Sequence, residues 1–73
     1  MRVDLQKWMQ DNMMKSGMSQ SEIARKSGLS TAVVAQIATG KTKNPTIGNV
    51  IKIARAMGVT LDSVNYYVIE LDD

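Results

Sequence analysis

Apolar residues recur every four positions near the start of the chain, at Leu5, Met9 and Met13. This spacing is typical of an amphipathic α-helix and predicts a first helix over residues 3–15. Gly17 follows it, and a glycine just past a helix end adopts the left-handed conformation that terminates the helix. The chain is therefore expected to open with a helix whose apolar side is buried.

Two shorter helices follow, and each begins after a serine that can cap it. Ser19 precedes Glu22 by three residues, which is the spacing of a capping box, and this helix stops at Gly28. Ser30 caps the next helix, which ends before Gly40. The pattern thus predicts two short helices separated by a three-residue turn.

The second half of the chain also contains residues that can cap and end helices. Residues 41–46 form a basic, polar loop that holds the only proline. Thr46 is expected to cap a fourth helix ending at Gly58, and Thr60 a fifth helix. Residues 66–71 are β-branched and aromatic, and six residues are too few for periodicity to decide between a strand and an extension of the fifth helix.

Together these elements predict an all-α, compact five-helix domain over residues 1–65, followed by a tail over residues 66–73. Trp8 is expected to be partly buried, and five methionines are expected to fill the core: Met9, Met13, Met14, Met18 and Met57. The other inward-facing residues are expected to be Ile23, Ala24, Val34, Ile37, Leu61 and Val64. The apolar residues of the fourth helix are Val50, Ile51, Ile53, Ala54 and Met57.

Composition then removes several classes of function. The 73 residues include no cysteine and no histidine, which excludes a disulfide framework, a zinc finger, a cysteine protease and a Ser-His-Asp hydrolase. We expect no cofactor. No apolar run reaches the ~20 residues of a membrane span, and the charged first residues do not resemble a signal peptide. These features favour a cytoplasmic protein.

Charge is distributed unevenly along the chain. Residues 15–55 contain seven basic residues and one acidic residue, a net charge of +6, whereas residues 56–73 contain four acidic residues and no basic one. A basic centre indicates a polyanionic partner, although a lopsided solubilising surface would give the same pattern.

The two short helices form a helix-turn-helix candidate. Close crossing of the helices requires a small residue, supplied by Ala24, and the turn requires positive φ, supplied by Gly28. The second helix of such a unit buries one face and offers the other to the DNA major groove. The offered face is expected to carry Thr31, Ala32, Ala35 and Gln36.

Several segments, taken jointly, resemble the Cro and lambda-repressor (XRE-like) DNA-binding family. They are the run SQSEIARKSGLS over residues 19–30, the pair Gly40-Lys41, Pro45, and the run IARAMGVTLD over residues 53–62. The resemblance covers roughly residues 5–65. It implies five helices, a reading unit made of the second and third, and binding to double-stranded DNA at a palindromic operator as a homodimer. It also points to a bacterial or phage protein associated with the nucleoid.

The resemblance implies roles for individual positions. Base edges are expected to be read by Thr31, Ala32 and Gln36, and phosphates to be held by Gln20, Lys41, Lys43 and Asn44. We add Val33 and Ala35 to the base-reading candidates and Arg25 and Ser30 to the phosphate-binding candidates.

The chemistry of these side chains agrees with contacts to DNA but also allows purely structural or solvent-exposed roles. Gln36 can pair bidentately with adenine, and a thymine methyl can pack on Ala32 or Thr31, but Gln36 could also be a solvated helix residue. Lysines in the loop supply phosphate charge without sequence choice. Arg25 also suits the end of its helix electrostatically. For Val33 we favour partial burial in the core over a thymine contact.

The chain also departs from the family pattern. Many members carry a basic residue near Met13 that pairs with an acid near Ala38, and here both positions are apolar. We expect packing to replace that buried ion pair.

The tail is more apolar than the exposed end of a small monomer should be. We favour a dimer interface there, with strands paired across the two-fold axis, formed by Leu61, Tyr66, Tyr67, Val68, Ile69 and Leu71. In the alternative, the tail folds back onto the first helix. The acidic end of the chain should point away from DNA in either case.

The leading functional interpretation is a sequence-specific transcriptional regulator, most simply a Cro-like repressor. The alternative is an antitoxin-type interaction module that binds its own promoter and a protein partner through the tail. An enzyme is disfavoured because general acid–base work needs paired groups in a pocket, and the only adjacent carboxylates, Asp72 and Asp73, lie at the chain end. Gly40-Lys41-Thr42 also lacks the upstream glycine of a P-loop.

Overall fold

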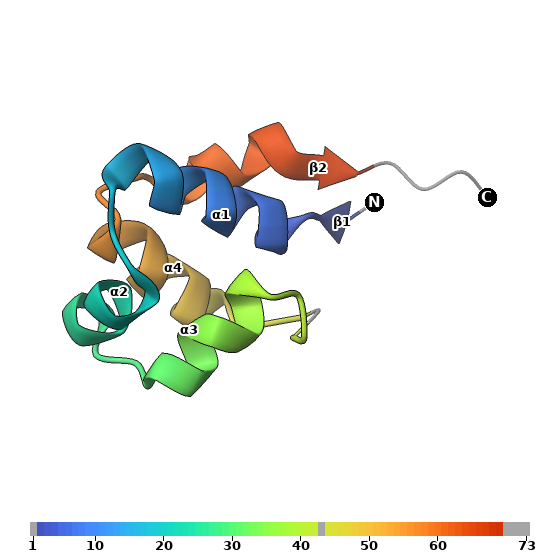
Figure 1. Ribbon diagram of the computed structural model, residues 1–73. Helices are drawn as coiled ribbons and strands as arrows, with labels where there is room; N and C mark the ends of the chain where they lie inside the picture. Colours follow the sequence, from blue (N-terminus) through green and yellow to red (C-terminus); the bar gives the residue numbers. More distant parts are fainter. Residues whose placement is uncertain (1, 43, 70–73) are drawn as a thin grey trace.

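The helices lie where their capping residues place them. In the computed structural model, which describes residues 2–42 and 44–69, the helices are α1 (Leu5–Ser16), α2 (Gln20–Ser27), α3 (Thr31–Ala38), α4 (Ile47–Ala56) and the 3-10 helix η1 (Leu61–Tyr67) (Figure 1). Two short strands, β1 (Arg2–Val3) and β2 (Val68–Ile69), complete the described elements. The prediction of an all-α, five-helix fold is confirmed.

Each α-helix begins with a side chain that accepts the backbone N–H three residues further on. The four caps are Asp4, Ser19, Ser30 and Thr46, with oxygen-to-nitrogen distances of 3.1–3.2 Å. At Ser19 the capping box is complete, because Glu22 Oε1 in turn accepts the N–H of Ser19 at 3.3 Å. These local bonds confirm the predicted starts of α2, α3 and α4.

One predicted helix start and one predicted cap need correction. The first helix begins at Leu5 instead of Val3, because Asp4 is its cap and Val3 belongs to β1. The fifth helix is of the 3-10 type, and Thr60 makes no side-chain capping bond. Its carbonyl accepts the N–H of Ser63 at 3.1 Å, which is the i to i+3 bond of a 3-10 turn.

The apolar tail contains both of the structures left open by the sequence. Tyr66 and Tyr67 extend η1, and Val68 then enters β2. β2 pairs antiparallel with β1, opposing Val3 to Val68. Leu71 lies outside the described residues.

The core is built from α1 through α4. Its buried apolar side chains are Trp8, Met9, Ile23, Ala24, Val34, Ile37, Ala38, Val50, Ile53, Ala54 and Met57. Met13 packs against this core, as expected if packing replaces the family ion pair, and so do Leu61 and Val64 of η1. Ile51 is half-buried.

Two expectations about the core were wrong. Trp8 is fully buried, because its indole N–H finds a partner in Ser63 Oγ at 2.7 Å, which removes the usual reason for the ring to stay partly exposed. Met14 is 83% exposed. It is five residues after Met9, which places it about 140° around α1 from that buried side chain, on the side facing solvent.

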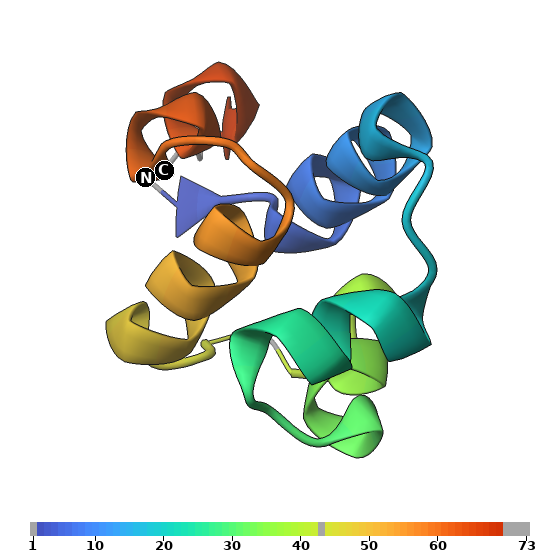
Figure 2. The ribbon, with the colours of Figure 1, turned by 90° about the vertical axis from the view of Figure 1, so that its left-hand side faces the viewer.

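The elements divide between two sides of the molecule. α3 packs against α2 and α1, while η1 packs against α1 and α4. The α2–α3 pair therefore lies on one side, and η1 with the strands lies on the other (Figures 1 and 2). Among the described residues, no helix is both long and apolar enough to cross a membrane.

Candidate nucleic-acid interface

The turn between α2 and α3 has the geometry that a helix-turn-helix unit requires. Gly28 ends α2 with φ of +75°, a left-handed conformation that costs other residues energy. Ser27 Oγ donates to the carbonyl of Ala24 and accepts the N–H of Leu29 at 3.3 Å, which ties the turn to its helix. Ala24 itself is only 4% exposed, as a close crossing of the two helices requires.

One face of α3 is directed to solvent. Thr31, Ala32 and Gln36 are exposed, and Ala35 is half-buried. Val33 is half-buried and packs against the core, which favours the core interpretation of this residue. The structure thus brings three of the five base-reading candidates together on an open helical surface, and their contact with bases stays a prediction.

Gln36 is held by the loop that follows its helix. The Thr42 hydroxyl donates to Gln36 Oε1 at 3.3 Å, and the Thr42 N–H donates to the Gln36 carbonyl at 3.1 Å. Sequence reasoning did not single out Thr42, because its partner is known only once the loop turns back on α3.

The phosphate-binding candidates flank this face. Gln20 is the first residue of α2 and is half-buried, and Arg25 is exposed on the same helix. Ser30 is exposed, and its hydroxyl oxygen accepts the Val33 N–H at 3.2 Å, so its proton is available to another acceptor.

Beyond α3, the loop presents two further phosphate candidates. Lys41 and Asn44 are exposed there, and Lys43 lies outside the described residues. Polar and cationic groups therefore lie at both ends of the exposed face of α3, where they could meet the two edges of a groove. Phosphate contact by each of them stays a prediction.

Two glutamines of α1 support the far end of α3, a role that sequence reasoning missed. Gln10 Nε2 donates to the carbonyl of Ala38 at 2.8 Å, at a helix end where carbonyls lack partners within the helix. Gln6 lies over Gly40, where an added Cβ would stand 2.5 Å from Gln6 Oε1. Gln6 and Gln10 are four residues apart, so the sequence places both on one face of α1. That spacing is the signal that could have indicated a shared contact.

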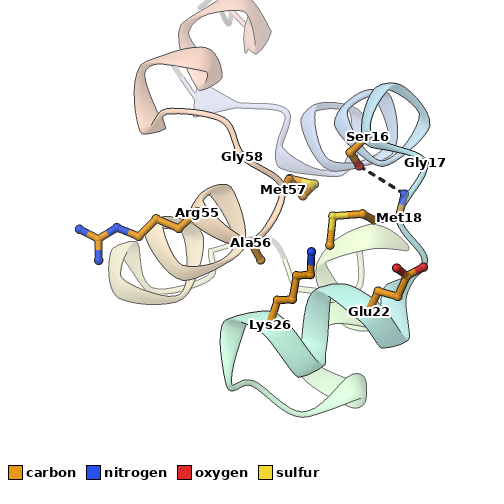
Figure 3. A pocket seen from close by; sticks show the side chains of 9 residues that line it. All are labelled: Ser16, Gly17, Met18, Glu22, Lys26, Arg55, Ala56, Met57 and Gly58. Atoms are coloured by element: carbon orange, nitrogen blue, oxygen red, sulfur yellow. Dashed lines mark hydrogen bonds between the residues drawn. The ribbon is translucent and has the colours of Figure 1, made fainter.

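The groove in Figure 3 lies away from this surface. It is lined by the link between α1 and α2, by one side of α2, and by the end of α4: Ser16, Gly17, Met18, Glu22, Lys26, Arg55, Ala56, Met57 and Gly58. Arg55 points away from the other labelled side chains (Figure 3). None of the base-reading candidates lines it. The candidate site is therefore the exposed face of α3 and not a groove, and a DNA major groove is wide enough to admit an α-helix.

The interface candidates of the tail divide into packed and open residues. Leu61 packs against the core, and the Tyr67 hydroxyl donates to Asp11 Oδ2 at 2.8 Å. That hydrogen bond, with burial and the nearby negative charge, raises the pKa of Tyr67 above its ordinary value of 10.0. Tyr66 is 88% exposed, Val68 is exposed, and Ile69 is half-buried. Within one chain, Tyr67 contacts α1, as expected if the tail folds back onto the first helix. Pairing of the tail with a second copy stays a prediction.

Comparison with known proteins identifies the family. A family model described as helix-turn-helix matches residues 10–64, well over half of the chain. Comparisons with curated proteins and with solved structures gave no match. The matched span contains α2, the Gly28 turn and α3, and the family has a DNA-binding fold that is generally non-enzymatic. The chain therefore belongs to the XRE-like, Cro/C1-type helix-turn-helix family and is a DNA-binding transcription regulator.

Proposed function

We propose that the protein is a sequence-specific repressor that binds a palindromic operator as a homodimer, with α3 in the major groove. The observation that carries this proposal is the exposed face of α3, with Thr31, Ala32 and Gln36 open to solvent. Because one long polar side chain stands among small ones, Gln36 would supply the main hydrogen-bonded base contact. Methyl contacts and DNA shape would supply the rest.

The flanking groups support a fixed position on the duplex. Ser30 lies at one end of α3 and Lys41 and Asn44 lie past the other, so backbone contacts would bracket the reading face. Contacts of this kind orient a protein on DNA without selecting sequence. We assign DNA binding to residues 1–65.

The tail supports the proposed dimer. β2 uses one edge to pair with β1, and its other edge offers backbone groups to a strand of a second copy. Tyr66, which is 88% exposed at the end of η1 just before β2, would be covered in such a pair. We therefore assign dimerisation to residues 66–73, of which residues 66–69 lie on the side of the molecule away from α3 (Figures 1 and 2).

Selection of bound duplexes from a random pool tests the reading function. A palindromic winner with half-site centres about one helical turn apart is expected. On that operator, Gln36→Ala should cost about 1–3 kcal/mol and leave binding to random DNA almost unchanged. Asn65→Ala removes an exposed amide from η1 and serves as the matched control, expected to be neutral. Failure of the parent to enrich any sequence would overturn the proposal.

Sedimentation tests the dimer. The parent is expected to sediment as a dimer at high concentration, and Tyr66→Lys should shift it toward monomer without altering the fold, because this side chain is open in the single chain. A parent that stays monomeric would contradict dimerisation. The open tail would then favour the antitoxin-type alternative, in which a different protein covers Tyr66 and Val68.

A further inference from the structure

We propose that Thr42 is a specificity-determining positioning residue, whose hydroxyl holds the Gln36 side-chain amide beside the end of α3, in place to read adenine. The inference rests on the proposed function, because it concerns how that reading face discriminates between bases.

The contact between Thr42 and Gln36 has two parts. The Thr42 N–H donates to the Gln36 carbonyl at 3.1 Å, and this bond holds the loop against the end of α3. From there the Thr42 hydroxyl reaches Gln36 Oε1 at 3.3 Å. Thr42 is half-buried whereas Gln36 is exposed, so the more enclosed Thr42 side chain anchors the more exposed Gln36 side chain.

The hydroxyl restrains the position of the Gln36 amide. A glutamine amide has two ends of similar shape, an oxygen that accepts and a nitrogen that donates, and a free side chain presents either end by rotation. Thr42 donates to Oε1 in the orientation observed, and its hydroxyl can accept from Nε2 in the reversed one, so either bond keeps the amide beside the loop. In the observed orientation, one lone pair of Oε1 and both Nε2 hydrogens remain unused by Thr42.

Those remaining groups match adenine. Adenine presents one acceptor, N7, and one donor, N6–H, to the major groove, and a glutamine pairs with it through Nε2–H and Oε1 together. An amide held beside the loop by Thr42 is already placed for this pairing, whereas a free glutamine side chain loses rotamer freedom when it binds. Thr42 thereby strengthens the pairing that distinguishes adenine from the other bases, and it does so without touching DNA bases.

The test removes the hydroxyl and leaves its surroundings intact. Thr42→Val keeps the β-branched shape and the backbone N–H, and Thr42→Ser keeps the hydroxyl. Dissociation constants are measured on the selected operator, on operators with each base pair substituted in turn, and on random DNA at several salt concentrations. Circular dichroism and thermal unfolding establish that each variant is folded.

We expect Thr42→Val to lower the preference for the base pair read by Gln36 by at least about fivefold, part of the discrimination that a bidentate contact supplies. Preferences at other positions, binding to random DNA and the salt slope should match the parent. Thr42→Ser should restore the preference. In a Gln36→Ala background, Thr42→Val should have no further effect, because the group that it positions is gone.

The outcomes separate this inference from the proposed function. If the parent is selective and Gln36→Ala relaxes one position, but Thr42→Val retains the parental preference, the inference is overturned and the function stands. If Thr42→Val loses equal affinity for operator and random DNA, Thr42 is only a loop contact and the inference is overturned. Failure of Thr42→Ser to restore the preference would overturn the inference as well. A parent without any sequence preference overturns the proposed function itself.

Discussion

Replacing Ser63 with alanine removes one hydroxyl and should destabilise the fold, because the buried indole of Trp8 bonds to that hydroxyl. Ser63 Oγ accepts the indole N–H of Trp8 at 2.7 Å and donates to the Thr60 carbonyl at 2.7 Å. It joins η1 to α1 across almost the whole sequence. In Ser63→Ala the indole N–H loses its partner while the ring stays fully buried.

The size of the effect follows from where each partner lies. A buried donor left without an acceptor costs about 1–3 kcal/mol, whereas the exposed bond to the Thr60 carbonyl can be replaced by water at little cost. We therefore expect a loss of about 2 kcal/mol. A domain of this length has a free energy of unfolding of about 4–11 kcal/mol, so the loss is a large fraction of the total. The melting temperature should fall by roughly 8–16 °C.

Urea unfolding measures this directly. Trp8 is the only tryptophan, so its fluorescence reports the environment of the group under test. The midpoint should fall while the slope with urea stays unchanged, since the surface exposed on unfolding is the same. Ser16→Ala is the matched control, because its hydroxyl bonds to Met13 and Met18 are exposed, and it should change the free energy of unfolding by less than about 0.5 kcal/mol.

A double-mutant cycle provides the stricter check. Trp8→Phe removes the donor, so Ser63→Ala should cost much less in that background than in the parent, with unfolding followed by circular dichroism. Equal costs in both backgrounds would show that the hydrogen bond is not the cause. A Ser63→Ala protein as stable as the parent would refute the argument outright.

Three other predictions concern charge, protonation and backbone conformation. Lys41→Ala should weaken binding to operator and random DNA alike and make the salt slope shallower by about one unit, which filter binding at several salt concentrations would measure. The hydrogen bond to Asp11 raises the pKa of Tyr67, so the folded chain holds the phenol proton more tightly than the unfolded chain does. The contribution of this bond to the free energy of unfolding is therefore complete below pH 10 and is lost as pH rises through the raised pKa. The difference in unfolding free energy between parent and Tyr67→Phe should accordingly shrink in alkaline urea titrations. Gly40→Ala and Gly28→Ala should each destabilise by about 1–2 kcal/mol in thermal melts, because both residues have positive φ and the Cβ added at Gly40 meets only the movable end of the exposed Gln6 side chain.

The parts of the fold that sequence predicted are those governed by local bonds. Ser19, Ser30 and Thr46 each bond a backbone N–H three residues away, so short patterns suffice to place α2, α3 and α4. Gly28 took the left-handed conformation for the same local reason. The helix-turn-helix unit was predictable because all of its determinants lie within about twenty residues.

Long-range partners were not predictable in this way. The burial of Trp8 depends on Ser63, and the position of Tyr67 depends on Asp11, both far apart in sequence. The same limit applies within the candidate site, where the exposure of Gln36 follows from helical spacing but its contact with Thr42 requires the path of the loop. The sequence pattern predicted the exposed face of α3, and only the tertiary structure showed which loop residue contacts it.

The pairing of β1 with β2 has a consequence for the order in which the chain folds. Val3 and Val68 are almost a full chain length apart, whereas α2 and α3 are neighbours. Contacts between distant residues carry a larger loop-closure cost and form after local ones. The reading unit can thus assemble early, and the strand pair closes late. Changes that weaken the strand pair should then speed unfolding and leave the folding rate nearly untouched.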